Sequence, residues 1–105
     1  MTTIKRPFID RQTAQKIDAK IPTPFYVYDE VGIIKNIENI RSAFSWNKGF
    51  KEYFAVKALP NPFILKLMRQ HGIGVDCSSL TELMLSEAAG FSGDEIMFSS
   101  NETPE

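Results

Sequence analysis

Residues 51–79 have the sequence KEYFAVKALPNPFILKLMRQHGIGVDCSS, and this stretch decides the fold. The apolar and aromatic run at 52–57 predicts a strand. An Asn-Pro pair and a later glycine are typical start and stop signals of a helix, so they predict one over 61–72. Residues 73–77 predict a second strand. A strand, a helix and a strand with short connections indicate a parallel βαβ unit.

The same alternation extends in both directions from this unit. Toward the amino terminus, residues 10–19 predict a short helix and the aromatic run at 25–28 predicts a strand. Residues 30–46 carry isoleucines and a phenylalanine at three- and four-residue spacing, which predicts a helix. Toward the carboxyl terminus, a capping-box sequence opens a predicted helix over 79–89, and residues 95–99 predict a further strand.

The predicted order therefore defines an α/β fold with a parallel sheet. Parallel sheets bury both faces, so further strands must complete either a doubly wound sheet or a (β/α)8 barrel. A barrel needs roughly 250 residues, and about half of its strands would lie in these 105 residues. The last residues follow a predicted strand, where Thr103 and Pro104 are suited to begin a helix. We therefore expect a truncated barrel that is cut at its carboxyl end.

Composition narrows the class of ligand. Hydrophobic residues make up 43% of the chain and charged residues 24%, as in ordinary globular proteins. The net charge of -1 offers no electrostatic surface for nucleic acid or anionic lipid, and no apolar run approaches the ~20 residues that span a bilayer. Cys77 is the single cysteine, which fits a reducing compartment. We expect a cytoplasmic protein without a metal site, whose partners are small molecules.

Lys57 is the first candidate for chemistry. Alternation along the predicted strand puts Tyr53, Ala55 and Lys57 on one face, and Lys57 at the carboxyl end of that strand. Active sites of α/β sheets and barrels lie at this edge. Partly desolvated surroundings favour a neutral amine, which attacks aldehydes to form imines. The alternative is a strand-end lysine whose ammonium lies in solvent.

Asp76 and Glu82 are acidic candidates near the same edge. Asp76 ends the face that it shares with Gly74, one βα unit beyond Lys57, and is suited to orient a cofactor group or a positive charge. Its structural alternative is a carboxylate that caps the following helix. Glu82 stands three residues after Ser79, so closure of a capping box already explains it.

Four other polar residues have simpler interpretations. His71 falls in the last turn of its helix, where it interacts with the helix dipole, and we assign it no acid or base role. Cys77 is expected to be a small buried residue rather than a nucleophile. Ser99 and Asn101 follow the last predicted strand and could line the same cavity, although turn formation is their commoner use.

Four blocks resemble, in order and spacing, the amino-terminal third of diaminopimelate decarboxylases, which are alanine-racemase-like, fold type III enzymes that bind pyridoxal phosphate. The blocks are TPFYVYD at 23–29, FAVKA at 54–58, GVDCSSLTEL at 74–83 and IMFSSN at 96–101. The Ala-Val-Lys piece alone also occurs in the nucleotide-binding strand of protein kinases. No glycine-rich loop precedes it here, which argues against a kinase.

The resemblance implies roles for four residues. Lys57 matches the lysine that forms the internal aldimine with pyridoxal phosphate. Ala55 matches a small residue beside the cofactor, while Asp76 and Glu82 match acidic positions of the cofactor pocket. Phe54 stands where many relatives have tyrosine, on the other face of the strand. The phosphate-binding loops and the remaining catalytic residues would lie beyond these 105 residues.

The resemblance also implies an organisation and an activity. Residues 1–24 correspond to a lead-in that belongs with a second, β-rich domain, and residues 25–105 to the first part of a TIM-like barrel in a homodimer. The implied activity is that of a carboxy-lyase, which converts meso-diaminopimelate to L-lysine and carbon dioxide in lysine biosynthesis. Ornithine, arginine and carboxynorspermidine decarboxylases of the same fold stay open, as does a non-catalytic homologue. The isolated 105 residues are expected to be inactive.

Overall fold

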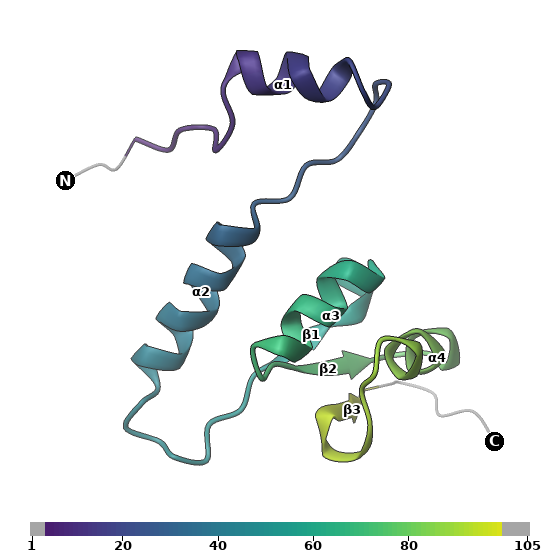
Figure 1. Ribbon diagram of the computed structural model, residues 1–105. Helices are drawn as coiled ribbons and strands as arrows, with labels where there is room; N and C mark the ends of the chain where they lie inside the picture. Colours follow the sequence, from purple (N-terminus) through teal and green to yellow (C-terminus); the bar gives the residue numbers. More distant parts are fainter. Residues whose placement is uncertain (1–3, 100–105) are drawn as a thin grey trace. The chain divides into compact units, whose positions relative to one another are not determined.

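The computed structural model describes residues 4–99 and divides into two compact units, residues 1–36 and 37–105 (Figure 1). Helix α1 (Arg11–Asp18) lies in the first unit, and helix α2 (Glu30–Ala43) runs from the first unit into the second. The second unit holds every strand of the described residues. Within residues 4–99, no helix combines the length and the hydropathy that crossing a membrane requires.

Helix α1 confirms the short helix that residues 10–19 predict. Asp10 precedes its first turn, and its carboxylate accepts the backbone N–H of Thr13 at 2.7 Å. This hydrogen bond satisfies one of the donors that every helix leaves free at its start. It also lowers the pKa of Asp10, because the bond favours the ionised carboxylate.

The predicted strand at 25–28 is wrong, because the structure has no strand there. The segment alternates as an extended chain does: Phe25 and Val27 are half-buried, whereas Tyr26 and Tyr28 are exposed and stack with their ring centroids 6.5 Å apart. A strand needs a neighbour that takes its backbone hydrogen bonds, and strand propensity alone does not supply one. Within the described residues no strand pairs with this segment.

Helix α2 confirms the prediction for 30–46, although it ends at Ala43. Asp29 fixes its start by accepting the backbone N–H of Gly32 at 3.0 Å. Near its end, Arg41 donates to the backbone carbonyl of His71, the residue that follows helix α3 (Pro62–Gln70). The carbonyl groups at the end of α3 lack partners within the helix, so this hydrogen bond satisfies one of them.

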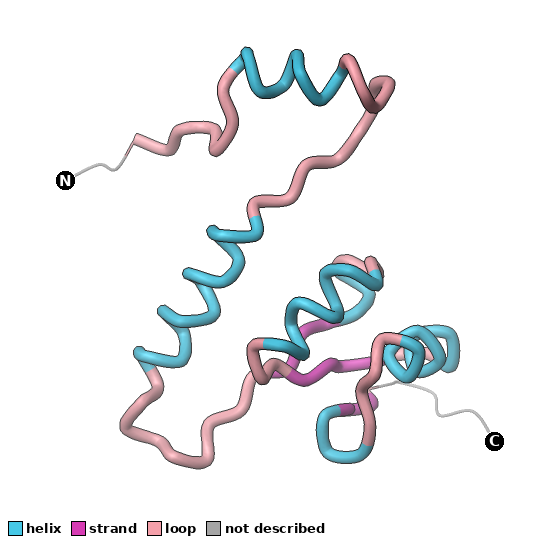
Figure 2. Tube along the Cα trace, viewed as in Figure 1, coloured by secondary structure: helices cyan, strands magenta, loops and turns pink. Residues whose placement is uncertain are grey.

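The second unit contains a three-stranded parallel sheet in the order β1-β2-β3, drawn in magenta in Figure 2. The strands are β1 (Tyr53–Ala55), β2 (Gly74–Cys77) and β3 (Ile96–Phe98). They confirm a strand within each of the predicted ranges 52–57, 73–77 and 95–99, although β1 ends two residues before the predicted end. In the register of the sheet, Asp76 lies between Ala55 and Met97. Helix α3 connects β1 to β2, and helix α4 (Leu80–Ala88) connects β2 to β3.

The hydrophobic core lies on the face of the sheet that α3 and α4 cover. Val75 and Cys77 of β2 point into it and are fully buried. Leu65 of α3 and Phe91, which follows α4, pack against them. Because strand residues alternate between faces, Asp76 points to the opposite side of the sheet from its two buried neighbours. Asp76 on that opposite face, together with residues just beyond the carboxyl ends of β1 and β2, forms the candidate site.

Candidate functional site

Lys57 lies just beyond the carboxyl end of β1. The strand stops at Ala55, and Val56–Ala58 form a short 3-10 turn, η1. The expectation that Lys57 shares a strand face with Tyr53 and Ala55 is therefore wrong, since strand alternation ends before it. Val56 is fully buried in the core and anchors the turn, while Lys57 is exposed. Within residues 4–99, the Lys57 amine has no hydrogen-bond or ion-pair partner.

Asp76 stands one strand away, beside Ala55 in the register of the sheet. Its side chain is half-buried, and its Oδ1 atom is shielded from solvent and has no hydrogen-bond partner. The η1 turn packs against β2, so Lys57 and Asp76 belong to elements in contact. A buried carboxylate oxygen without a donor costs free energy, on the order of 1–3 kcal/mol. Asp76 is therefore suited to accept a hydrogen bond from a group that these residues lack.

Glu82 occupies the first turn of α4. The Ser79 hydroxyl accepts the backbone N–H of Glu82 at 3.3 Å, which confirms Ser79 as the helix cap. The other half of the predicted capping box differs: the Ser79 hydroxyl, rather than the Ser79 backbone N–H, donates to Glu82 Oε2 at 2.7 Å. Glu82 Oε1 is buried and has no hydrogen-bond partner. The contact with the cap residue therefore uses only Oε2 of the Glu82 carboxylate.

Cys77 lies on β2, directly after Asp76. The thiol is fully buried, with its Sγ atom 3.3 Å from the hydroxyl of Ser86. Burial raises the pKa of Cys77, and the charges of Glu82 and Asp76 raise it further, against the opposing hydrogen bond from Ser86. The expectation that Cys77 is a buried core residue is confirmed.

The remaining polar candidates lie elsewhere or outside the described residues. His71 follows the last turn of α3, and its carbonyl serves the structural contact with Arg41. Ser99 is exposed, and its backbone N–H donates to the carbonyl of Cys77 at 2.8 Å, which extends the pairing of β3 with β2. Asn101 lies outside the described residues. Residues 4–99 contain no group of histidine, cysteine or acidic side chains arranged to hold a metal ion.

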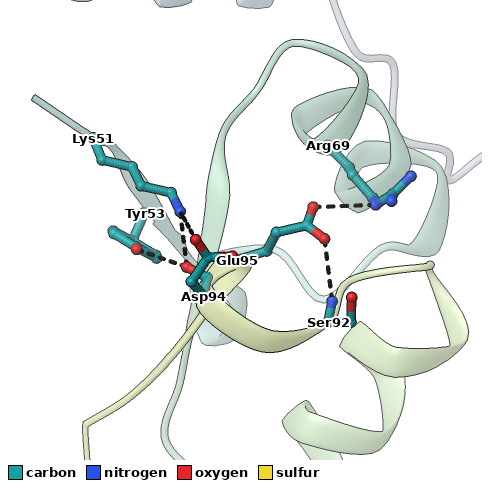
Figure 3. Close-up of polar contacts among 6 residues, drawn as sticks. All are labelled: Lys51, Tyr53, Arg69, Ser92, Asp94 and Glu95. Atoms are coloured by element: carbon teal, nitrogen blue, oxygen red, sulfur yellow. Dashed lines mark hydrogen bonds and ion pairs between the residues drawn. The ribbon is translucent and has the colours of Figure 1, made fainter. Parts of the chain in front are cut away.

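The amino-terminal edge of the sheet carries a polar network that the sequence reasoning missed (Figure 3). The carbonyl of Asp94 accepts hydrogen bonds from Lys51 Nζ and from the Tyr53 hydroxyl, each at 2.8 Å. The Asp94 carboxylate also pairs with Lys51 at 3.8 Å. These contacts join the start of β1 to the turn that precedes β3.

Glu95 completes that network, and both of its carboxylate oxygens have partners. Glu95 Oε1 accepts the backbone N–H of Ser92 at 3.3 Å, and Oε2 pairs with Arg69 at 3.3 Å (Figure 3). The signal for this turn was present in the sequence, because Ser92 and Glu95 have the spacing of a capping box. The pairing with Arg69 joins residues distant in the sequence and could not be predicted from spacing.

Comparison with known proteins identifies the class of protein to which this chain belongs. The family described as "Pyridoxal-dependent decarboxylase, pyridoxal binding domain" matches residues 31–105. The chain therefore belongs to the pyridoxal-phosphate-dependent decarboxylases, and the family resemblance drawn from the four sequence blocks is confirmed. The cofactor of the family is pyridoxal phosphate.

The curated relatives are several times longer than this chain. Protein TabA from Pseudomonas amygdali pv. tabaci is 52% identical over 82 residues, which are 78% of the chain and 19% of the relative. An L-glutamyl-[BtrI acyl-carrier protein] decarboxylase from Niallia circulans is 36% identical, covering 87% of the chain and 21% of the relative. A diaminopimelate decarboxylase from Thermoplasma acidophilum is 32% identical, covering 92% and 24%. The chain thus spans about a fifth of the length of these relatives.

Solved structures support the same class. Ornithine decarboxylase from Entamoeba histolytica superposes with a TM-score of 0.77 at 28% identity, covering 89% of this chain and 29% of that one. Diaminopimelate decarboxylase (I148L mutant) from Helicobacter pylori, complexed with L-lysine, gives a TM-score of 0.67 at 31% identity, covering 83% and 22%. The three-stranded α/β arrangement of residues 37–99 is therefore part of a fold type III decarboxylase fold.

Proposed function

We propose that the protein is a pyridoxal-phosphate-dependent amino acid decarboxylase in which Lys57 carries the cofactor. One observation supports this assignment most directly: two buried carboxylate oxygens without donors, on Asp76 and Glu82, belong to the strand and the helix that pack against the turn of Lys57. Buried oxygens of this kind fit a site that receives a positively charged nitrogen. The primary amine of Lys57 is the group that an aldehyde cofactor requires.

The other residues of the site hold and orient this nitrogen. Asp76 and Glu82 are placed on adjoining elements, where their negative charges stabilise a protonated nitrogen at Lys57. Ala55, next to Asp76 in the sheet, is small and leaves space at the strand end for the flat ring of the cofactor. Bound pyridoxal phosphate supplies an electron sink for the carbon that loses carbon dioxide.

The architecture of the whole protein is part of the proposal. The parallel order β1-β2-β3, with α3 and α4 in contact with each other, is compatible with the first strands of a (β/α)8 barrel. We assign residues 25–105 to that barrel and residues 1–24 to a lead-in associated with a second, β-rich domain. We further propose that the whole protein is a homodimer in the cytoplasm.

The substrate that we propose is meso-diaminopimelate, with L-lysine and carbon dioxide as products. Diaminopimelate decarboxylases recur among the relatives, and one solved relative is complexed with L-lysine. Ornithine is the second candidate, because the ornithine decarboxylase of Entamoeba histolytica superposes with the higher of the two TM-scores. Release of carbon dioxide, measured for the protein from its complete reading frame with each amino acid, separates the two. Release from ornithine alone contradicts the diaminopimelate assignment.

Covalent labelling tests the role of Lys57. The protein from its complete reading frame is incubated with pyridoxal phosphate, reduced with borohydride and digested. The expected result is a cofactor-modified peptide that contains Lys57. Lys51, two residues before β1, serves as an internal control, because its amine is held by Asp94 at the other edge of the sheet. Label at Lys51 or at any other lysine instead of Lys57 contradicts the proposal.

The isolated 105 residues are expected to release no carbon dioxide. A sheet of three strands exposes unpaired strand edges and does not enclose a cofactor. Assay of the isolated chain beside the complete protein, both loaded with pyridoxal phosphate, checks this expectation. Decarboxylation by the isolated chain at a rate comparable to that of the complete protein would show that the site needs nothing further.

A further inference from the structure

The Ser79 hydroxyl makes two hydrogen bonds at once. It accepts the backbone N–H of Glu82 at 3.3 Å and donates its own proton to Glu82 Oε2 at 2.7 Å. The first bond is an ordinary helix cap. The second is not needed for capping, because a capping box uses the backbone N–H of the cap residue to hold the carboxylate. Ser79 therefore restrains a side chain as well as a helix.

This second bond determines which oxygen of Glu82 is available. Oε2 is occupied by Ser79, whereas Oε1 is buried and has no partner. A free carboxylate would turn toward solvent, which lowers the cost of the unpaired oxygen. With Oε2 held by Ser79, the carboxylate group cannot turn toward solvent without breaking a short hydrogen bond.

We propose that Ser79 is a positioning residue for the cofactor nitrogen at Lys57: by holding Glu82 Oε2, its hydroxyl keeps Oε1 directed at that nitrogen. The inference rests on the proposed function. The titratable groups of η1, β2 and α4, which pack against one another, are Lys57, Asp76, Cys77, Glu82 and Glu87. Helix α3, which contacts α4 and β2, adds Lys66 and Arg69. Of these groups, Asp76 and Glu82 are the two whose buried carboxylate oxygens lack a hydrogen-bond partner.

The test measures the absorbance of the bound cofactor as a function of pH in the protein from its complete reading frame. A well-placed carboxylate favours the protonated nitrogen, so loss of the Ser79 hydroxyl should move the absorbance midpoint to lower pH. In Ser79→Ala we expect a fall of about half a pH unit. Ser79→Thr keeps a hydroxyl and should return the midpoint to the wild-type value.

Two further variants separate positioning from folding. Ser79→Ala also removes a helix cap, at a cost of about 0.5–2 kcal/mol, whereas glycine at a cap position costs only a few tenths. Ser79→Gly should therefore shift the midpoint as Ser79→Ala does while it unfolds close to the wild-type temperature. Ser92→Ala is the matched control, because Ser92 opens the equivalent turn at the other edge of the sheet, and its midpoint should not move.

A double variant identifies the partner through which Ser79 acts. If the hydroxyl works through Glu82, Ser79→Gly should cause no further shift in a Glu82→Gln background. A wild-type midpoint in both Ser79→Gly and Ser79→Ala overturns the inference, and so does an undiminished shift in the Glu82→Gln background. Borohydride labelling of the same samples keeps the two proposals apart: label at Lys57 with unmoved midpoints refutes only the role of Ser79, whereas label elsewhere refutes the proposed function itself.

Discussion

Two turns with the same Ser-x-x-Glu spacing lie at opposite edges of the sheet and are completed differently. At the amino-terminal edge, Glu95 uses both oxygens, one for the Ser92 backbone and one for Arg69. At the carboxyl edge, Glu82 uses one oxygen for Ser79 and leaves the other buried without a donor. The first turn is complete as a structural element. The second turn retains one hydrogen-bond acceptor, Glu82 Oε1, that has no donor within residues 4–99.

Under the proposed function, this difference separates stability from function between the two edges of the parallel sheet. In α/β barrels, chemistry belongs to the carboxyl edge and the other edge serves folding. Here the ion pairs of residues 4–99, Lys51 with Asp94 and Arg69 with Glu95, all lie at the amino-terminal edge. The buried carboxylate oxygens of residues 4–99 that have no hydrogen-bond partner, Asp76 Oδ1 and Glu82 Oε1, lie at the carboxyl edge. Variants at matched positions of the two edges test this contrast.

The largest effect is expected from the two lysines. Lys57→Ala should abolish the long-wavelength absorbance of the bound cofactor and lower kcat/KM by at least ~1000-fold, because no other amine of the described site replaces it. Lys51→Ala should keep the absorbance and lose at most about 1 kcal/mol of stability, the usual value of an exposed ion pair. Absorbance spectra and steady-state kinetics of both variants check this. Equal loss of cofactor from the two variants would remove the contrast between the edges.

The two glutamates should give the next largest effect. Glu82→Gln keeps the size and the helix position but removes a charge near the cofactor nitrogen, so kcat/KM should fall on the order of 10- to 100-fold with little change in unfolding temperature. Glu95→Gln should show the reverse, with normal kinetics and a loss of up to about 1 kcal/mol of stability. Steady-state kinetics and thermal unfolding of both variants test these two expectations. A kinetic defect in Glu95→Gln as large as that in Glu82→Gln contradicts the assignment.

Gly74 tests the amino-terminal edge as a packing element. A Cβ atom there would lie 2.7 Å from the Tyr53 ring and 2.7 Å from the backbone carbonyl of Glu95. Gly74→Ala should therefore destabilise the protein by about 1–3 kcal/mol, because the backbone at Glu95 cannot move aside freely. Denaturant unfolding measures this loss, and the folded variant should retain the spectrum of the bound cofactor. An unchanged unfolding midpoint would show that this edge is loosely packed.

The smallest effect concerns the pH dependence of stability through Cys77. Its pKa in the folded protein is raised above the ordinary value of 9.0, so the unfolded chain releases this proton first. The contribution of the thiol to stability is therefore complete below pH 9.0 and is lost as the pH rises above that value. Thermal unfolding across this range should show a steeper alkaline decline for the wild type than for Cys77→Ala.

Glu82→Gln sharpens the same measurement. The charge of Glu82 contributes to the raised pKa of Cys77, after burial. The glutamine variant should therefore show a smaller alkaline decline than the wild type, whereas Glu95→Gln should not differ from it. Identical pH profiles for Glu82→Gln and the wild type would mean that the Glu82 charge does not act on this thiol.

Local signals in the sequence predicted much of the second unit. Asn61, Ser79 and Gly72 mark helix ends through hydrogen bonds and backbone angles that depend only on near neighbours, and the structure confirms all three. Two predictions went wrong where the outcome depends on other strands. Residues 25–28 have strand propensity but no pairing neighbour, and β1 ends at Ala55, before Lys57.

The sequence names candidate residues for the site but not their geometry. Lys57, Asp76 and Glu82 are candidates because of their positions at predicted strand and helix ends, and their roles stay predictions. That Glu82 leaves one oxygen unused could not be predicted, because the choice between the Ser79 backbone and the Ser79 hydroxyl as donor depends on a side-chain rotamer. The contacts of Arg69 and Lys51 with the turn before β3 likewise depend on how the strands pack side by side.

The strand order carries a consequence for how the chain is made. Each strand pairs with the one synthesised immediately before it, β2 with β1 and β3 with β2, so each pair of strands is joined through one α-helix and one short 3-10 turn. Such near-neighbour pairing costs little loop entropy and can proceed from the amino-terminal side while translation continues. The nascent polypeptide can thus assemble this sheet strand by strand as it leaves the ribosome.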